Sequence, residues 1–158
     1  MLPLGYLGPA PGWGQARGTR LNHDEQRTFV TLWCIFRSPL MVGGRLPSAN
    51  AWTVSLLTNR EVLAVDQHSA ESRPVVSTDK VVVWRAKSQH GYYVAVFNVS
   101  PETQRISYNW SELGLQGASY RLRDLWEHKD LGNAASLSVE LPSHASILYS
   151  VTASTTKH

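Results

Sequence analysis

The spacing of apolar residues changes near residue 70, and this change limits the possible folds more than any other feature. In the first part, aromatic and aliphatic residues recur every three or four positions, as on one face of a helix: Phe29, Leu32, Trp33 and Phe36. In the second part, segments rich in Val, Tyr and Phe follow one another in short runs typical of strands. The two patterns predict an α/β segment over residues 1–70, an all-β segment over 71–152 and a flexible tail over 153–158.

The first segment has local signals for two strand–helix units. Asn22 can cap a helix, with Glu25 three positions later completing a capping box. Ser38-Pro39 ends that helix, because proline disfavours helical geometry in the residue before it. The apolar runs at 1–5 and 40–42 are strand-like, and the second is closed by Gly43-Gly44, as in a buried parallel strand. A second helical pattern covers 51–57, Thr58-Asn59 breaks it, and an amphipathic turn covers 61–65.

The second segment has the spacing of an antiparallel β-sandwich. Gln89-His90-Gly91 lies between two strongly β-prone runs and indicates a hairpin. Further turns are expected at Gly114, Gly132 and Pro142. Short strands separated in this way are typical of two packed antiparallel sheets. The predicted strands cover 81–87, 92–98, 105–110, 119–126, 136–141 and 145–151.

Composition excludes several classes of function. The net charge is +3 and the arginines are scattered, so no basic stripe predicts a nucleic-acid partner. The single cysteine, Cys34, rules out a disulfide framework and is expected to be a buried, unreactive thiol. The six histidines lack metal-ligand spacing, so neither a metal nor another cofactor is predicted. No apolar run is long enough to span a bilayer, and the first residues lack a signal-peptide pattern, so localisation is not indicated.

Several stretches resemble one family of glycosidases. The stretch most specific to this family extends from Asp24-Glu25-Gln26-Arg27-Thr28 to Gly43-Gly44. The next most specific stretch covers residues 56–67. Asp124-Leu125-Trp126 and Leu141-Pro142-Ser143-His144 continue the match into the β segment. The chain is similar, from Met1 to about residue 151, to the C-terminal part of glycoside hydrolase family 27, the melibiase-like α-galactosidases and α-N-acetylgalactosaminidases. The resemblance implies that residues 1–70 are the last two units of a (β/α)8 barrel and that a Greek-key β domain follows.

The resemblance also implies where the chemistry lies. Family members hydrolyse terminal α-linked galactose with two aspartates, a nucleophile and an acid/base, both on earlier barrel strands. We therefore expect no catalytic residue in this chain. Met1 matches a methionine that follows an acidic sugar-binding residue in the family's seventh-strand motif. The resemblance implies that Met1 contacts the sugar, and the abrupt apolar opening suggests that it is an internal residue of a longer enzyme.

The carboxylates in the chain have simpler explanations than catalysis. Asp24 and Glu25 suit the N-terminus of a helix, where negative charge is stabilised. Asp66 closes a helix and Asp79 lies in an expected turn. Asp124 and Glu127 are three apart on a predicted strand, so their side chains would point to opposite faces. We therefore expect no pair of facing carboxylates, which glycoside hydrolysis requires.

Arg45 departs from the family, which usually has Asp at this position. The change of sign could alter an ion pair or the rim of the sugar pocket. It could equally be neutral if Arg45 faces solvent, as most arginines do.

Three weaker signals have both a functional and a structural interpretation. His144 is expected to form hydrogen bonds in a turn. Asn98-Val99-Ser100 and Asn109-Trp110-Ser111 fit the glycosylation sequon, at about the frequency expected by chance. A set of aromatic residues could stack on sugars, although strand aromatics more often fill a core: Trp84, Tyr92, Tyr93, Tyr108, Trp110 and Trp126.

Three hypotheses of function follow. The first is the C-terminal fragment of a retaining α-galactosidase, inactive alone, with α-galactosides as its sugar partners. The second is a non-catalytic carbohydrate-binding or interaction module, which requires Trp110 and Trp126 to be accessible on a sheet face. The third is one half of a split glycosidase, complemented by an upstream barrel fragment.

Overall fold

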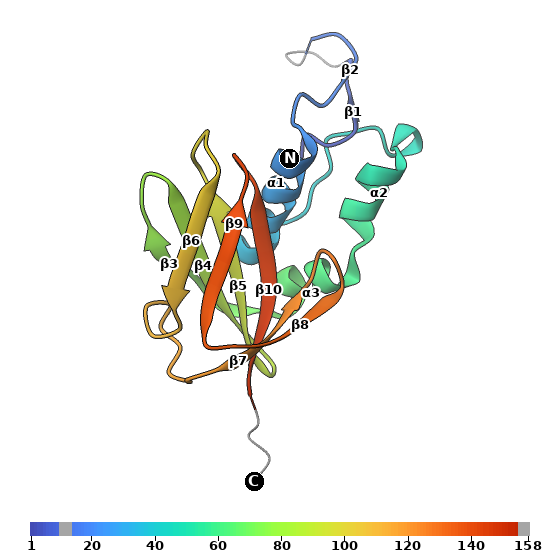
Figure 1. Ribbon diagram of the computed structural model, residues 1–158. Helices are drawn as coiled ribbons and strands as arrows, with labels where there is room; N and C mark the ends of the chain where they lie inside the picture. The colour runs from blue at the N-terminus through green and yellow to red at the C-terminus, as the bar shows by residue number, and fades with distance from the viewer. Residues whose placement is uncertain (10–13, 155–158) are drawn as a thin grey trace.

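The computed structural model describes residues 1–9 and 14–154 of the chain (Figure 1). The predicted tail 153–158 lies mostly outside the described residues, and β10 continues to Ala153. The elements of the first part are β1 (Tyr6–Leu7), β2 (Arg17–Gly18), α1 (His23–Phe36), a 3-10 turn (Leu46–Ser48), α2 (Ala51–Thr58) and α3 (Arg60–His68). Those of the second part are β3 (Ala70–Ser77), β4 (Val81–Ser88), β5 (Gly91–Asn98), β6 (Gln104–Asn109), β7 (Tyr120–Asp124), β8 (Lys129–Ala134), β9 (Ser136–Leu141) and β10 (Ser146–Ala153).

The described strands of the second part form two antiparallel sheets. One has the order β3-β4-β5-β10-β7-β8, and the other pairs β6 with β9. The β6–β9 pair covers one face of the larger sheet, and α1 lies against the opposite face (Figure 1). The structure is thus mostly antiparallel β, with a few helices on one side, consistent with a β-sandwich.

Side-chain alternation in the central strands explains this layering. In β10, Ile147, Tyr149 and Val151 belong to the core under β6–β9, whereas Leu148 belongs to the core under the helices. Successive side chains on a strand point to opposite faces, so both faces of the larger sheet are covered. The core on the helical side joins residues from both parts of the chain, including Leu2, Val30, Val62, Phe97 and Trp126.

Local signals set the ends of α1. Asn22 accepts a hydrogen bond from the backbone N–H of Glu25, and the Glu25 carboxylate accepts one from the backbone N–H of Asn22. The helix ends at Phe36, and Arg37 takes a left-handed conformation before Pro39. The predicted capping box and the predicted end of the helix are both confirmed. Asn59 ends α2 and caps α3, which runs longer than the expected turn.

The two strand-like runs of the first part meet side by side in parallel. Leu2 and Val42 form a parallel bridge, and the backbone N–H of Gly43 donates to the Leu2 carbonyl. The expected strands are thus reduced to single bridged residues. The bridge is close enough to require glycine, because a Cβ at Gly44 would collide with the Leu4 carbonyl oxygen.

All six predicted strands are present, with three differences. β3 and β8 were not predicted, because Pro74 interrupts one and β8 is almost wholly exposed, without alternation. Gly132 lies inside β8 at a shift in the β7–β8 register, so the predicted turn there is wrong. β7 ends at Asp124 and not at residue 126, because the Asp124 side chain accepts hydrogen bonds from the backbone N–H groups of Trp126 and Glu127.

The close approach at Gly44 gives a stability prediction. We expect Gly44→Ala to destabilise the fold by about 1–3 kcal/mol, because the added methyl group forces the backbone of Leu4 and Tyr6 away from Gly44. Gly18→Ala is the matched control, since a Cβ there meets nothing within 4 Å. Its effect should stay within about 0.5 kcal/mol in urea unfolding. Equal effects of the two substitutions would contradict the packing at Gly44.

Candidate functional site

Met1 lies at the exposed end of the parallel bridge. Its side chain packs over Gly43, where a Cβ would come within 2.9 Å of the Met1 Sδ. Met1 is 64% exposed and Met41, whose carbonyl accepts from the Leu2 N–H, is 66% exposed. Met1 is therefore accessible to a bound molecule, and its contact with sugar stays a prediction. Arg45 is also exposed, which fits the neutral interpretation of its departure from the family pattern.

Most of the described carboxylates have partners that explain them structurally. Glu25 caps α1, Asp124 holds the turn after β7, and Glu112 accepts from the backbone N–H of Asn109. Others form ion pairs: Glu71 with Lys87, Glu127 with Arg27, and Glu140 with Arg105. Asp124 and Glu127 do not share a strand, contrary to prediction, because residues 125–128 form a turn. They engage different partners, and Glu127 is exposed.

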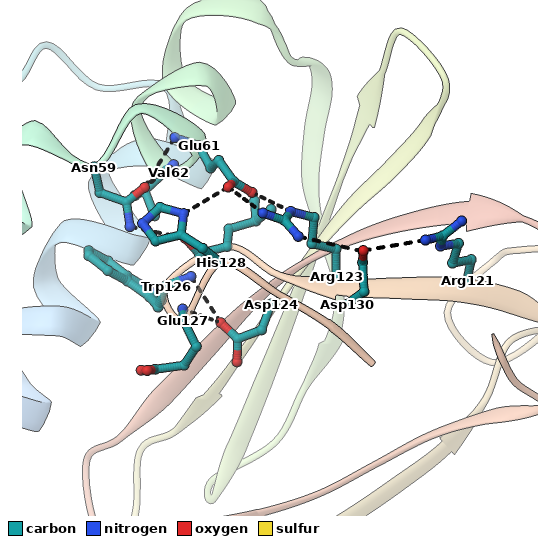
Figure 2. Close-up of polar contacts among 11 residues, drawn as sticks. Asn59, Glu61, Val62, Arg121, Arg123, Asp124, Trp126, Glu127, His128 and Asp130 are labelled. Carbon is teal, nitrogen blue, oxygen red and sulfur yellow. Dashed lines mark hydrogen bonds and ion pairs between the residues drawn. The ribbon is translucent and has the colours of Figure 1, made fainter. Parts of the chain in front are cut away.

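Glu61 is at the centre of a cluster of charged side chains (Figure 2). The Arg123 guanidinium donates to both oxygens of Glu61, at 2.7 Å each, and His128 Nδ1 lies 2.7 Å from Oε1. Arg123 also pairs with Asp130, which contacts Arg121. The hydrogen bonds from Arg123 hold the pKa of Glu61 below its ordinary value, although burial opposes this. The same pair raises the pKa of Arg123.

The cluster lies beside a turn that joins α3 to the sandwich. Asn59 Oδ1 accepts hydrogen bonds from Glu61 and Val62 at the start of α3, while its amide donates to the Leu125 carbonyl at 3.0 Å (Figure 2). Asn59 is buried, so this amide would be costly to leave unpaired. One side chain thus caps a helix and fixes the β7–β8 turn against it.

α1 holds the other side of the same turn. The indole of Trp126 donates to the Thr31 hydroxyl at 2.9 Å. The Arg27 guanidinium lies 5.4 Å from the Trp126 ring and 5.6 Å from the Trp52 ring, and it pairs with Glu127. A guanidinium held against two aromatic faces is favourable, so Arg27 links α1, α2 and the turn.

His144 forms a second link between α1 and the sandwich. Its Nδ1 lies 3.2 Å from Glu25 Oε1, and its carbonyl accepts a hydrogen bond from the Thr28 hydroxyl. The pKa of Glu25 is lowered, first by the backbone N–H of Asn22 and then by His144. The prediction that His144 forms hydrogen bonds in a turn is confirmed.

Neither the cysteine nor the possible metal ligands form a reactive or metal-binding site among the described residues. Cys34 is buried, and burial raises the pKa of its thiol to about 12, as expected for an unreactive cysteine. Within residues 1–9 and 14–154, no three His, Cys, Asp or Glu side chains gather closely enough to hold a metal ion. The same residues contain no helix with the length and hydropathy that a membrane span requires.

The aromatic and sequon signals mostly have structural explanations. Trp110 is 2% exposed and Trp126 is 8% exposed, so neither can serve as a surface for stacking sugars. The Asn98 amide is buried and donates to the carbonyls of Glu102, Leu141 and Pro142. The asparagine of this sequon therefore has a structural role. Asn109, by contrast, is exposed.

Comparison with known proteins decides the family. The family described as "Alpha galactosidase C-terminal beta sandwich domain" matches residues 78–151. The crystal structure of a GH27 β-L-arabinopyranosidase from Geobacillus stearothermophilus is 43% identical, with a TM-score of 0.93 over 99% of this chain. The chain matches the C-terminal part of glycoside hydrolase family 27 enzymes. It is also 31% identical to an α-galactosidase of Cyamopsis tetragonoloba and 28% identical to α-galactosidase 3 of Arabidopsis thaliana, over 93% and 97% of its length.

The match covers only the C-terminal part of the family 27 relatives. The chain spans 38% of the length of both plant enzymes and 37% of the Geobacillus enzyme. The sequence motifs thus identified the family correctly, but the Glu61 cluster was missed. Asn59 before Arg60-Glu61 has the form of a helix cap and could have been found. Arg123 and His128 carry no such signal, because their partner is more than sixty residues away.

The lowered pKa of Glu61 predicts a pH-dependent contribution to stability. The stabilisation of the fold by ionised Glu61 is fully present above the ordinary pKa of a glutamate. It is lost as the pH falls through the lower pKa that Glu61 has in the folded state. We expect Glu61→Gln to lower the free energy of unfolding by about 1 kcal/mol near pH 7, a modest amount because solvent partly screens the carboxylate. Near pH 3 the loss should be clearly smaller, because protonation of Glu61 already weakens its pairing with Arg123. Thermal unfolding at both pH values measures the difference.

Glu140→Gln is the control, because the Arg105–Glu140 pair is exposed on both sides. Such a pair contributes little, so its loss should cost less than about 0.5 kcal/mol at either pH. If Glu61→Gln costs as much near pH 3 as near pH 7, the ionised carboxylate does not stabilise the fold.

Proposed function

We propose that this chain is the C-terminal part of a glycoside hydrolase that acts on terminal pyranosides of the galactose type. The strongest support is the 43% identity to a family 27 enzyme over almost the whole chain. The catalytic carboxylates of such an enzyme would lie outside residues 1–158, since the carboxylates with partners in this chain form helix caps, turns and ion pairs. Met1 would contact the sugar without a catalytic role, and the chain alone would be inactive.

The proposal includes a division of the chain at about residue 70. Residues 1–70 would be the last two units of a (β/α)8 barrel and residues 71–152 the Greek-key sandwich. The parallel Leu2–Val42 bridge supports the first part, because parallel pairing between strand–helix units is how such barrels are built. The position of β10 between β5 and β7 supports the second, because strands distant in sequence are neighbours in Greek keys.

The substrate class follows from what the relatives are named to act on. The plant relatives are α-galactosidases, and the Geobacillus relative is a β-L-arabinopyranosidase. The α-D-galactopyranosyl and β-L-arabinopyranosyl groups share the configuration of their ring hydroxyls and differ by a hydroxymethyl group. We therefore infer that the sugar contacting Met1 is one of these two rings.

The alternatives have less support. A carbohydrate-binding module that uses sheet aromatics loses its two main candidates, since Trp110 and Trp126 are buried. Complementation of a split glycosidase remains compatible with the proposed role, because an upstream barrel fragment would supply the same missing strands. Both alternatives can be tested together with the main proposal.

A hybrid enzyme tests the proposal. This chain would replace the matching C-terminal 37% of the Geobacillus enzyme, and turnover of p-nitrophenyl α-D-galactopyranoside and β-L-arabinopyranoside would be measured. We expect the hybrid to be active and the isolated chain to be indistinguishable from a blank. Mixing the chain with the separate Geobacillus N-terminal part tests complementation. Turnover by the isolated chain would contradict the assignment of the carboxylates.

The same hybrid tests Met1. We expect Met1→Ala to raise KM about fivefold with a smaller change in kcat, because about 1 kcal/mol of apolar contact with the bound sugar is lost. Leu131→Ala is the control, since Leu131 is a similarly exposed apolar residue on the edge strand β8. If both variants keep the kinetics of the parent hybrid, Met1 does not contact the sugar.

A further inference from the structure

A polar pocket lies between the loops that precede α1 and α2. Its volume is about 260 Å³, which suits a molecule of about one ring. Its lining includes Tyr6, Thr19, His23, Gln26, Asn50 and Trp52. The described residues that line it are polar, aromatic or glycine residues, and none of these is Asp, Glu, Lys or Arg. This composition favours an uncharged ligand.

Two residues that line the pocket each carry an enclosed polar atom without a hydrogen-bond partner among the described residues. One is Oε1 of Gln26, a side chain that is 4% exposed and whose amide nitrogen already donates to the Leu21 carbonyl at 2.8 Å. The other is the indole Nε1 of Trp52. Buried polar groups are normally paired, so each unpaired atom calls for a partner. One atom is an acceptor and the other a donor, and a hydroxyl group satisfies both kinds.

The donor is held in a fixed orientation. The Trp52 ring stacks on His23, with centroids 4.2 Å apart, and the Arg27 guanidinium lies 5.6 Å from the same ring. Its N–H direction is therefore set before any ligand binds. Neither unpaired atom touches solvent, so a ligand needs the side chains at the rim to rotate. Tyr6 is exposed and can do so on the timescale of surface rotamers.

The two helix N-termini beside the pocket do not call for an anion. Asn22 accepts a hydrogen bond from the backbone N–H of Glu25, and Asn50 accepts one from that of Thr53. Both helices are thus capped by their own side chains, which leaves less unmet N–H charge for a phosphate or carboxylate. The capping and the neutral lining both favour a hydroxylated ligand over an anionic one.

We propose that this pocket is a second saccharide-binding site, which takes one neutral pyranose ring through hydroxyl contacts with Trp52 Nε1 and Gln26 Oε1. Gly5 and Tyr6, which line it, lie on the segment that begins with Met1 and pairs with residues 41–45. The two sites would thus be neighbours on one backbone segment. The identity of the ligand as a sugar rests on the proposed function, whereas the hydroxyl chemistry rests on the two unpaired atoms.

Nuclear magnetic resonance of the ¹⁵N-labelled 158-residue chain tests the site directly, because the Trp52 indole N–H gives its own signal. D-galactose and L-arabinose are titrated to high millimolar concentration. We expect the Trp52 indole signal to shift saturably, while that of Trp110, which donates to the Ala134 carbonyl in the core, stays in place. Trp52→Phe assigns the signal and keeps an aromatic ring against His23. It should raise the Kd about tenfold, as expected for one lost hydrogen bond.

Controls separate this site from the one proposed at Met1. Trp33→Phe is the matched substitution outside the pocket and should leave the Kd unchanged, and thermal unfolding shows whether each variant is folded. Met1→Ala should leave the Trp52 shift intact. If sugar binding is lost in Met1→Ala but kept in Trp52→Phe, the pocket proposal is wrong and the role of Met1 stands. If the Trp52 signal does not respond to either sugar, a water molecule suffices for the two atoms and the second site does not exist.

Discussion

The turn at residues 124–128 is the contact on which the arrangement of the whole chain depends. Leu125 and Trp126 are buried in the core that the helices share with the larger sheet. An apolar pair of this size contributes several kcal/mol when it is removed from water, of the order of 1.5–3 kcal/mol for each side chain. The turn can bring them there because Asp124 closes it from within. Without this insertion, α1 and α3 would lose much of their packing against the sandwich.

Polar contacts around the turn determine the orientation in which α1 and α3 pack against it. Asn59 fixes the Leu125 carbonyl, Thr31 fixes the Trp126 indole, and the Arg123–Glu61 pair fixes the start of α3. Each of these bonds joins residues far apart in sequence and has a geometry that a shifted helix could not keep. Burial thus drives the docking of the helices, while the polar contacts select one docked arrangement. The partly exposed ion pairs add less energy than the apolar pair.

The sequence predicted what depends on local chemistry and missed what depends on distant partners. The capping box at Asn22, the stop before Pro39 and the strands with clear alternation follow from neighbouring residues, and the structure has them. β8 was missed because an exposed edge strand has no periodic apolar residues. The turn predicted at Gly132 was wrong because glycine occurs both in turns and where the register of two strands shifts. The Glu61 cluster and the polar pocket bring together side chains from separate elements. Only the fold places such groups side by side.

The core shared by the helices and the larger sheet implies that the helices of residues 23–68 and the sandwich form one cooperative unit. Native-state hydrogen exchange tests this most directly, because it measures the opening free energy of each amide. The shared core predicts that buried amides of α1, such as those of Val30 and Cys34, open with the same free energy as those of Val96 in β5 and Leu148 in β10. Opening of α1 at a free energy several kcal/mol lower, with the sandwich still protected, would contradict the claim.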